Sequence, residues 1–278
     1  MNKQINLIEK YFVINESVQP VSNFTYSYSS NAKILYEVIR VKNSTPIFLE
    51  QHLNRLWKSI NLLGLFVPDR NLTTMMIVDL LRANPVVENN IRISLVYGLS
   101  AEPDLLVYFI PSSYPTDDQK ANGINVKTLN AYRNNPNIKM ENGNLREKAD
   151  RIIGESGCYE VLLVNREGFI TEGSRSNIFF IKDSSLITPP IGIILGGITR
   201  QVVINISKDF GIPVIEKLIT VDSLSSFDGA ILTGTSPGVL PIASINNQLL
   251  KVKLPQILSL ISRYNMTVAN DISNFKMH

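Results

Sequence analysis

The sequence predicts a protein of two domains in the α+β or α/β class. Its 278 residues are 44% hydrophobic, enough to bury one large core or two smaller ones. Both halves combine strand–turn–strand patterns with helices. Between them, residues 111–123 are rich in proline, small polar residues and charge, as is typical of a linker. We therefore predict a small N-terminal α+β domain over 1–110, the linker 111–123, and a larger domain over 124–278.

The first half reads as a strand pair, a helix and a second strand pair. Residues 33–48 give strand, turn and strand, and apolar residues at helical spacing predict a helix over 49–63. His52, Arg55 and Ser59 form a narrow stripe beside the apolar face of this helix. Residues 89–99 and 103–111 then read as a second pair of strands.

The second half alternates strands and helices, with the strands mostly paired through hairpins. The expected order is a strand at 124–130, a polar loop at 131–143, a helix at 144–156, hairpins up to 190, a helix from about Ile198 closed by Gly211, a strand at 213–219, a buried strand at 228–234 and a last helix from about Pro255.

Composition excludes several classes of function. The net charge of +3 is spread along the chain, which argues against binding to nucleic acid or membranes. The single cysteine, Cys158, rules out an internal disulfide and favours a reducing, cytoplasmic setting. With only two histidines, His52 and His278, a zinc site or a His-based triad has little to build on, and we predict no metal.

Three segments could together bind a phosphate group. Gly196 and Gly197 precede a predicted helix whose first turn, with Thr199, offers free N–H groups to an anion. A buried strand ends just before Thr235 in "LTGTSPG", and Arg55 could pair with the same phosphate. The structural alternatives are a capped helix, an ordinary turn, and a surface arginine that covers the edge of the core.

A carboxylate and a lysine complete the set of candidate residues. Glu172 stands at the end of a strand in "ITEGS", where the alternative is an ordinary turn carboxylate. Lys139 lies in a polar loop that contains proline, where a solvated lysine is the usual finding. The residues alone therefore suggest a phosphate site in three pieces and a carboxylate at the end of a strand.

The same segments match a known family in their order and spacing. From "YEVIRV" to "GTSPGVLPI", the chain resembles the fold-type IV enzymes that use pyridoxal 5′-phosphate (PLP), namely the class IV aminotransferases and aminodeoxychorismate lyase. The most specific part is "NREGFITEGSRSNIFFIKDSSLITPP" followed by "LGGITR". The resemblance implies two α/β domains with PLP in the crevice between them, usually in a homodimer.

The resemblance also assigns a role to each candidate residue. Lys139, rather than Lys148, would form the Schiff base with PLP, and Glu172 would face the pyridine nitrogen. The phosphate would be bound by Arg55, by the backbone of Ile198 and Thr199, and by Thr235. Arg92, Ser236 and Tyr36 would contact the substrate.

Three functions are consistent with this resemblance. The first is an aminotransferase that moves an amino group between an amino acid, branched-chain among the candidates, and a 2-oxo acid. The second is a lyase of the aminodeoxychorismate type, which releases pyruvate. The third is a PLP-binding protein without turnover, since Asn31, Tyr97, Gly143 and Pro237 depart from the family pattern in the pocket.

Overall fold

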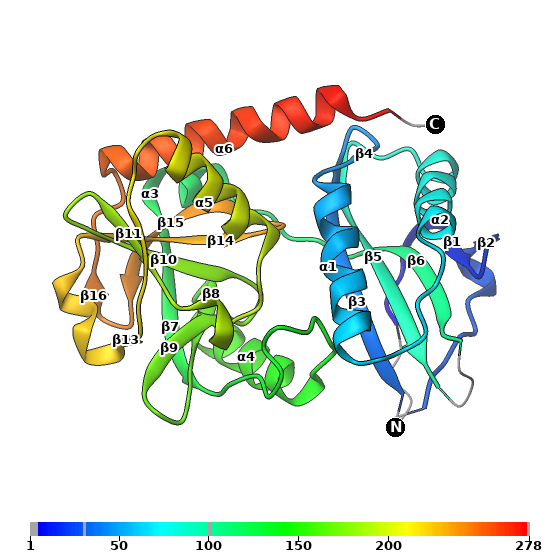
Figure 1. Ribbon diagram of the computed structural model, residues 1–278, viewed down its shortest axis with the longest axis horizontal. Helices are drawn as coiled ribbons and strands as arrows, with labels where there is room; N and C mark the ends of the chain where they lie inside the picture. The colour runs from blue at the N-terminus through cyan, green and yellow to red at the C-terminus, as the bar shows by residue number, and fades with distance from the viewer. Residues whose placement is uncertain (1–4, 30–31, 99–101, 277–278) are drawn as a thin grey trace. The chain divides into compact units, whose positions relative to one another are not determined.

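The computed structural model describes residues 5–29, 32–98 and 102–276 (Figure 1). The chain forms two compact units. Unit 1 comprises Met1–Ser113, Ile138–Glu141 and Val268–His278, and unit 2 comprises Tyr114–Asn137 and Asn142–Thr267. This division is discontinuous, whereas the sequence suggested continuous domains over 1–110 and 124–278, and those boundaries stay a prediction.

Unit 1 is built on an antiparallel sheet of six strands in the order β2-β1-β6-β5-β3-β4. The strands are β1 Ile8–Ile14, β2 Ser17–Pro20, β3 Lys33–Lys42, β4 Thr45–Pro46, β5 Glu88–Tyr97 and β6 Asp104–Ile110. Helices α1 Leu49–Leu62 and α2 Arg70–Ala83 pack on this sheet, α1 against β3 (Figure 1). Their apolar faces share one core with alternating residues of the strands, as half-buried strands require.

The helix α1 lies where the apolar spacing predicted it, whereas α2 was not predicted. The apolar stripe of α2 is weaker, although Asp69 marks its start. The Asp69 carboxylate accepts hydrogen bonds from the N–H groups of Asn71 and Leu72, which is ordinary N-capping. A short helix, α3 Asp117–Asn122, also forms inside the predicted linker, with a capping box between Thr116 and Gln119.

Unit 2 contains a mixed sheet with the strand order β12-β11-β10-β14-β15-β7-β8-β9-β13, and β16 pairs with β15. Its strands are β7 Ile124–Asn130, β8 Glu160–Val164, β9 Phe169–Gly173, β10 Asn177–Lys182, β11 Ser185–Thr188, β12 Val214–Glu216, β13 Ile219–Thr220, β14 Gly229–Gly234, β15 Gly238–Ile245 and β16 Gln248–Leu249. Its helices are α3, α4 Gly143–Ser156, α5 Ile198–Asp209 and α6 Pro255–Asn274. The last turns of α6, from Val268, belong to unit 1.

Parallel pairing in unit 2 goes beyond the hairpins expected from the sequence. Strands β7 and β8 run parallel and are joined through α4, and β15 also runs parallel to β7. A parallel pair needs such a crossover because a tight turn cannot join its ends. None of the described helices combines the length and the apolar character that crossing a membrane requires.

A buried ionic cluster ties α1 to β3 inside unit 1. Glu37 of β3 is fully buried and accepts hydrogen bonds from Arg55 Nε at 2.7 Å and Arg55 Nη2 at 2.6 Å. His52 Nδ1 lies 2.8 Å from the same carboxylate. Burial alone would raise the pKa of Glu37, but the charge of Arg55 and the hydrogen bonds from Arg55 and His52 outweigh it and lower the pKa to about 2.

We expect Glu37→Gln to destabilise unit 1 strongly, because it leaves the Arg55 charge without its counterion. The loss should be about 3–5 kcal/mol, the range for breaking one partner of a buried pair. Urea unfolding at neutral pH measures it. Glu88→Gln, which breaks the exposed Arg40–Glu88 pair of the same sheet, should cost less than about 1 kcal/mol.

The same cluster predicts how the stability of the protein changes at acidic pH. The pKa of Glu37 lies below its ordinary value of 4.5 when folded, so its contribution is complete above that value and is lost as the pH falls toward about 2. The stability difference between wild type and Glu37→Gln should therefore shrink over this acid range. A difference that stays constant from pH 7 to pH 3 would contradict the assignment.

Candidate functional site

The predicted site residues divide between the two units. Tyr36, Arg55, Arg92 and Lys139 belong to unit 1, whereas Glu172, Ile198, Thr199, Thr235 and Ser236 belong to unit 2. Each unit thus carries one part of the predicted set, and the contacts within each unit are described in turn.

Lys139 is held against β3 by backbone hydrogen bonds. The N–H of Tyr36 donates to the carbonyl of Lys139 at 3.1 Å, and the N–H of Glu141 donates to the carbonyl of Ile34 at 3.0 Å. Met140, beside the lysine, packs on the core of unit 1. A loop that is polar in sequence is therefore fixed in position, and the half-buried Lys139 side chain places Nζ 4.8 Å from the centre of the Tyr36 ring.

Arg92 contacts the same aromatic ring. Its guanidinium carbon lies 4.3 Å from the centre of the Tyr36 ring, so the structure brings Tyr36, Arg92 and Lys139 together. Arg92 also donates to the Ser94 hydroxyl at 3.0 Å and to the Glu141 carboxylate at 3.0 Å. The sequence analysis did not identify Glu141 as a partner of this arginine.

The surroundings of Arg55 were also not foreseen. Two of its nitrogens bind Glu37, and the exposed fraction of its side chain is only 12%. The alternative of a surface arginine therefore does not describe this residue. Burial is the main reason that the pKa of the neighbouring His52 is lowered, and the charges of Arg55 and Lys139 act in the same direction.

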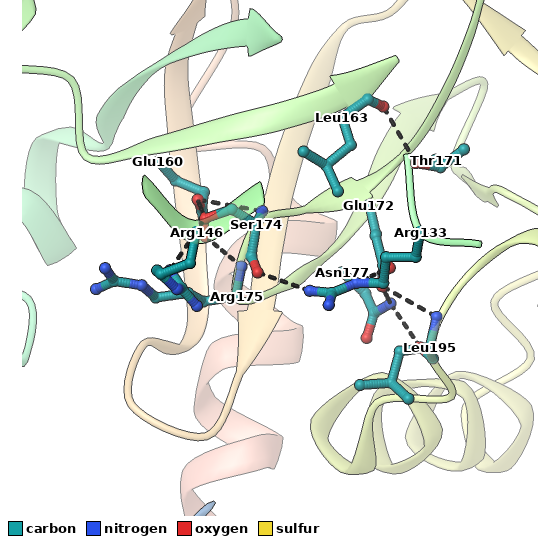
Figure 2. A network of polar contacts seen from close by, with 10 residues as sticks. All are labelled: Arg133, Arg146, Glu160, Leu163, Thr171, Glu172, Ser174, Arg175, Asn177 and Leu195. Carbon is teal, nitrogen blue, oxygen red and sulfur yellow. Dashed lines mark hydrogen bonds and ion pairs between the residues drawn. The ribbon is translucent and has the colours of Figure 1, made fainter. Parts of the chain in front are cut away.

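In unit 2, Glu172 is a buried carboxylate at the end of β9, with 3% of its surface exposed. Three donors converge on it, as Figure 2 shows: Arg133 Nε at 2.8 Å, the N–H of Leu195 at 3.0 Å and Asn177 Nδ2 at 3.4 Å. A solvated turn carboxylate would need none of these partners. Burial of a charge is tolerated here because an arginine and hydrogen bonds compensate it.

The turn after Glu172 is anchored by a second buried carboxylate, Glu160, on the neighbouring strand β8 (Figure 2). Glu160 accepts hydrogen bonds from the hydroxyls of Ser174 and Ser176 at 2.6 and 3.0 Å, and from the N–H of Arg175 at 3.1 Å. Burial raises the pKa of Glu160, against the effect of these hydrogen bonds.

Arg133 and Gly173 complete this anchoring. Arg133 donates from Nη2 to the carbonyl of Ser174 at 2.8 Å, so one guanidinium holds both Glu172 and the turn that follows it. A Cβ at Gly173 would lie 2.0 Å from the Ser176 hydroxyl oxygen, which leaves room for glycine alone. The position of Glu172 is therefore fixed by contacts on both sides along the chain.

The start of α5 lies next to this network. Gly197 is its N-cap and supplies no side-chain cap, so the first-turn N–H groups of Ile198 and Thr199 have no capping side chain. A Cβ at Gly197 would lie 1.9 Å from Asn177 Oδ1, and the same Asn177 donates to Glu172 and to the carbonyl of Leu195. Asn177 thus connects the carboxylate to the segment that leads into the helix.

Thr235 and Ser236 lie in the turn between β14 and β15, half-buried. Helix α5 packs against β14. Thr233, at the end of β14, is directly opposite Asn177 of β10, so the two side chains point to the same face. The Thr233 hydroxyl oxygen is buried and has no hydrogen-bond partner within the described residues.

The positions that depart from the family pattern have structural explanations in part. Gly143 is the first residue of α4, and the hydroxyl of Tyr97 donates to the carbonyl of Phe66 at 2.8 Å. Pro237 lies against Gly234, where an added Cβ would be 3.1 Å from the proline ring. Asn31 lies outside the described residues.

Sequence reasoning missed several residues of these networks. They are Glu37, Arg133, Glu141, Glu160, Asn177 and Thr233. Two of them offered a local signal: Asn177 opens the apolar run "IFFI", and Glu37 interrupts the apolar face of "KILYEVIRV" at the strand period of two.

Comparison with known proteins identifies the family of the chain. The family model described as amino-transferase class IV matches residues 34–245. A D-alanine aminotransferase of Staphylococcus aureus strain N315 is 30% identical over 264 residues, which cover 87% of this chain and 90% of that protein. A branched-chain-amino-acid aminotransferase of Pseudomonas aeruginosa is 30% identical over 223 residues, covering 73% and 72%.

A solved structure supports the same grouping. A protein of Legionella pneumophila, provisionally named 4-amino-4-deoxychorismate lyase, superposes with a TM-score of 0.77 at 25% identity and covers 88% of this chain and 97% of that chain. The family model matches most of the sequence, and the matched range 34–245 includes residues of both units. The chain therefore belongs to the class IV aminotransferases.

Proposed function

We propose that this protein transfers an amino group between an amino acid and a 2-oxo acid, with PLP bound covalently to Lys139. The observation that carries the proposal is the Glu172 carboxylate, which is buried, held by Arg133, and adjacent to an uncapped helix start. Few other functions need an anion so firmly positioned beside a place that could bind a phosphate.

The residues of unit 2 fit PLP chemically. Class IV aminotransferases use this cofactor, whose ring, when bound, accepts the electrons released at the substrate Cα. The N–H groups of Ile198 and Thr199 and the Thr235 hydroxyl would bind the phosphate, together with Arg55 of unit 1. The unpartnered Thr233 hydroxyl is a further donor on the same face as Asn177.

Each remaining residue has a defined task in the proposal. Glu172 would hold a proton on the pyridine nitrogen, while Arg133 pairs with the carboxylate and fixes its position. Lys139, after exchange with the substrate amine, would take the proton from Cα and return it as general base and acid. Tyr36, Arg92 and Ser236 would orient the substrate so that the breaking bond aligns with the ring.

The proposal also includes the oligomeric state of the protein and its cellular compartment. We expect a homodimer, as the family resemblance implies, and light scattering coupled to gel filtration tests it. A cytoplasmic location is supported by the single cysteine, Cys158, which is buried and unpaired as a thiol should be in a reducing compartment.

Lys139→Ala should abolish the covalent bond to PLP. Borohydride reduction of the wild type with PLP should give a stable adduct that peptide mass spectrometry places on Lys139, and the variant should give none at this position. Lys148→Ala is the matched control, because it removes a lysine from the exposed side of α4. An adduct at wild-type level in Lys139→Ala would refute the assignment.

Glu172→Gln should retain the adduct on Lys139 but slow transamination by at least about a hundredfold, because a neutral amide cannot keep the pyridine nitrogen protonated and the ring then accepts electrons less readily. Glu167→Gln, in the exposed turn of the same hairpin, should behave like wild type. Urea unfolding shows whether the variant is folded, since the change also leaves Arg133 without its counterion. A wild-type rate in folded Glu172→Gln would exclude the proposed role.

The second candidate function is a lyase, which the provisional name of the Legionella pneumophila protein supports. A transaminase should turn over only with a 2-oxo acid acceptor present, whereas a lyase should release pyruvate from aminodeoxychorismate without one. A screen of L- and D-amino acids against several acceptors, with pyruvate release as the second readout, separates the two. Any amino-group transfer from a plain amino acid also excludes a PLP-binding protein without turnover.

A further inference from the structure

The turn after Glu172 contains one peptide unit that is held from both sides. This unit joins Ser174 to Arg175. Its N–H, which belongs to Arg175, donates to Glu160 Oε2 at 3.1 Å. Its carbonyl, which belongs to Ser174, accepts from Arg133 Nη2 at 2.8 Å (Figure 2). A trans peptide unit directs its N–H and its carbonyl in opposite directions, so a partner on each side fixes the plane of the unit.

Glu160 makes further contacts that hold its carboxylate against this turn. Its Oε1 accepts from the N–H of Val161 at 2.9 Å, and from the N–H and the hydroxyl of Ser174 at 3.2 and 2.6 Å. Its Oε2 accepts from the hydroxyl of Ser176 at 3.0 Å as well as from Arg175. Each oxygen therefore binds more than one donor, and only 4% of the surface of Glu160 is exposed.

Closing the turn does not require this carboxylate. The N–H of Gly173 donates to the carbonyl of Ser176 at 2.7 Å, and the N–H of Ser174 donates to the carbonyl of Val161 at 3.0 Å. These backbone hydrogen bonds close the hairpin between β9 and β10 and join it to β8. Burying a carboxylate carries a desolvation cost that its hydrogen bonds must offset. The specific contribution of Glu160 is therefore the orientation of the peptide unit between Ser174 and Arg175.

Arg133 carries this orientation to Glu172. The guanidinium that binds the Ser174 carbonyl also donates from Nε to Glu172 Oε1 at 2.8 Å. If the peptide unit rotates, Arg133 loses one of these two acceptors, and the Glu172 carboxylate is held less firmly. Glu172 is also joined to Ser174 through Gly173 alone. All of these residues belong to unit 2, so the route from Glu160 to Glu172 lies within one unit.

We propose that Glu160 is a positioning residue for Glu172, which acts through the Ser174–Arg175 peptide unit and through Arg133. The inference rests on the proposed aminotransferase function, in which Glu172 keeps the pyridine nitrogen of PLP protonated. It goes beyond that function because it gives a part in the reaction to a residue that reaches Glu172 only through other groups of the protein.

Glu160→Gln tests the effect on the turn without the cofactor. The amide has the size of the carboxylate but only one acceptor oxygen, so it cannot accept hydrogen bonds at both ends of the group. In the PLP-free protein, peptides that cover 172–177 should exchange their amide hydrogens at least about tenfold faster than in the wild type, as measured by mass spectrometry.

Ser176→Ala and Ser244→Ala form a matched pair for this measurement. Ser176→Ala removes one donor from Glu160 and should speed exchange in the same peptides by at least about twofold. Ser244→Ala removes a buried hydroxyl that donates to Asn125 in the same unit, and should leave these peptides unchanged. Ser176→Ala also replaces Glu160→Gln if the latter does not fold. Wild-type exchange over 172–177 in the folded Glu160 or Ser176 variant overturns the inference.

The effect on Glu172 is measured in the protein loaded with PLP. A proton on the pyridine nitrogen disfavours a second positive charge on the nitrogen that joins PLP to Lys139. Glu172→Gln should therefore raise the pH midpoint at which the visible absorbance of bound PLP changes, by at least about one pH unit. Glu160→Gln should raise the same midpoint by at least about 0.3 pH unit.

Two comparisons separate positioning from other effects. Ile245→Ala, in the core of the same unit, should lower the stability of the protein without moving the midpoint. In a Glu172→Gln background, Glu160→Gln should move the midpoint by less than about 0.1 pH unit, since no carboxylate remains to be positioned. A full further shift in the double variant would show that Glu160 acts on PLP by its own charge, and that result overturns the inference.

Failure of the proposed function can be told apart from failure of this inference. Absence of a borohydride-stable adduct at Lys139 refutes the proposed function, and the role of Glu160 in the reaction with it. An adduct whose midpoint moves in Glu172→Gln but not in Glu160→Gln overturns the inference alone.

Discussion

The burial of the Glu172 carboxylate is the constraint on which the candidate site of unit 2 depends. A charge with 3% of its surface exposed must find compensating partners within the fold. Arg133 supplies the opposite charge, and Leu195 and Asn177 supply hydrogen bonds. These partners come from three different segments of the chain, so Glu172 links those segments at one point (Figure 2).

Unit 1 contains two further carboxylates that are each compensated by an arginine, and the two pairs differ in their exposure. Glu37 is fully buried and binds Arg55 and His52, so it joins a helix to the sheet and lies deep in the fold. Glu141 is only partly shielded and binds Arg92 close to Lys139. The first pair is buried in the core, whereas the second is partly exposed beside Lys139. Breaking one partner of a buried pair costs more than breaking an exposed pair.

The local sequence pattern was sufficient to predict much of the secondary structure. The apolar spacing of α1, the glycines before α5 and the buried strand β14 were all readable from neighbouring residues. The parallel pairing of β7 with β8 was not, because it depends on a crossover and not on a turn. The partners of the site residues could not be predicted for a related reason. Arg133 and Glu172 are far apart in sequence, and nothing local marks them as a pair.

The short segment 138–141 has a consequence for how the protein can be divided. It pairs with β3 of unit 1, yet the residues on both sides of it belong to unit 2. The chain therefore changes unit at four places, and no single cut gives two halves that each keep their own contacts. Neither a fragment ending in the linker nor the remainder would carry Lys139 together with the strand that holds it. Replacing one unit by a continuous piece of another chain would meet the same obstacle, because segment 138–141 would lose its pairing with β3.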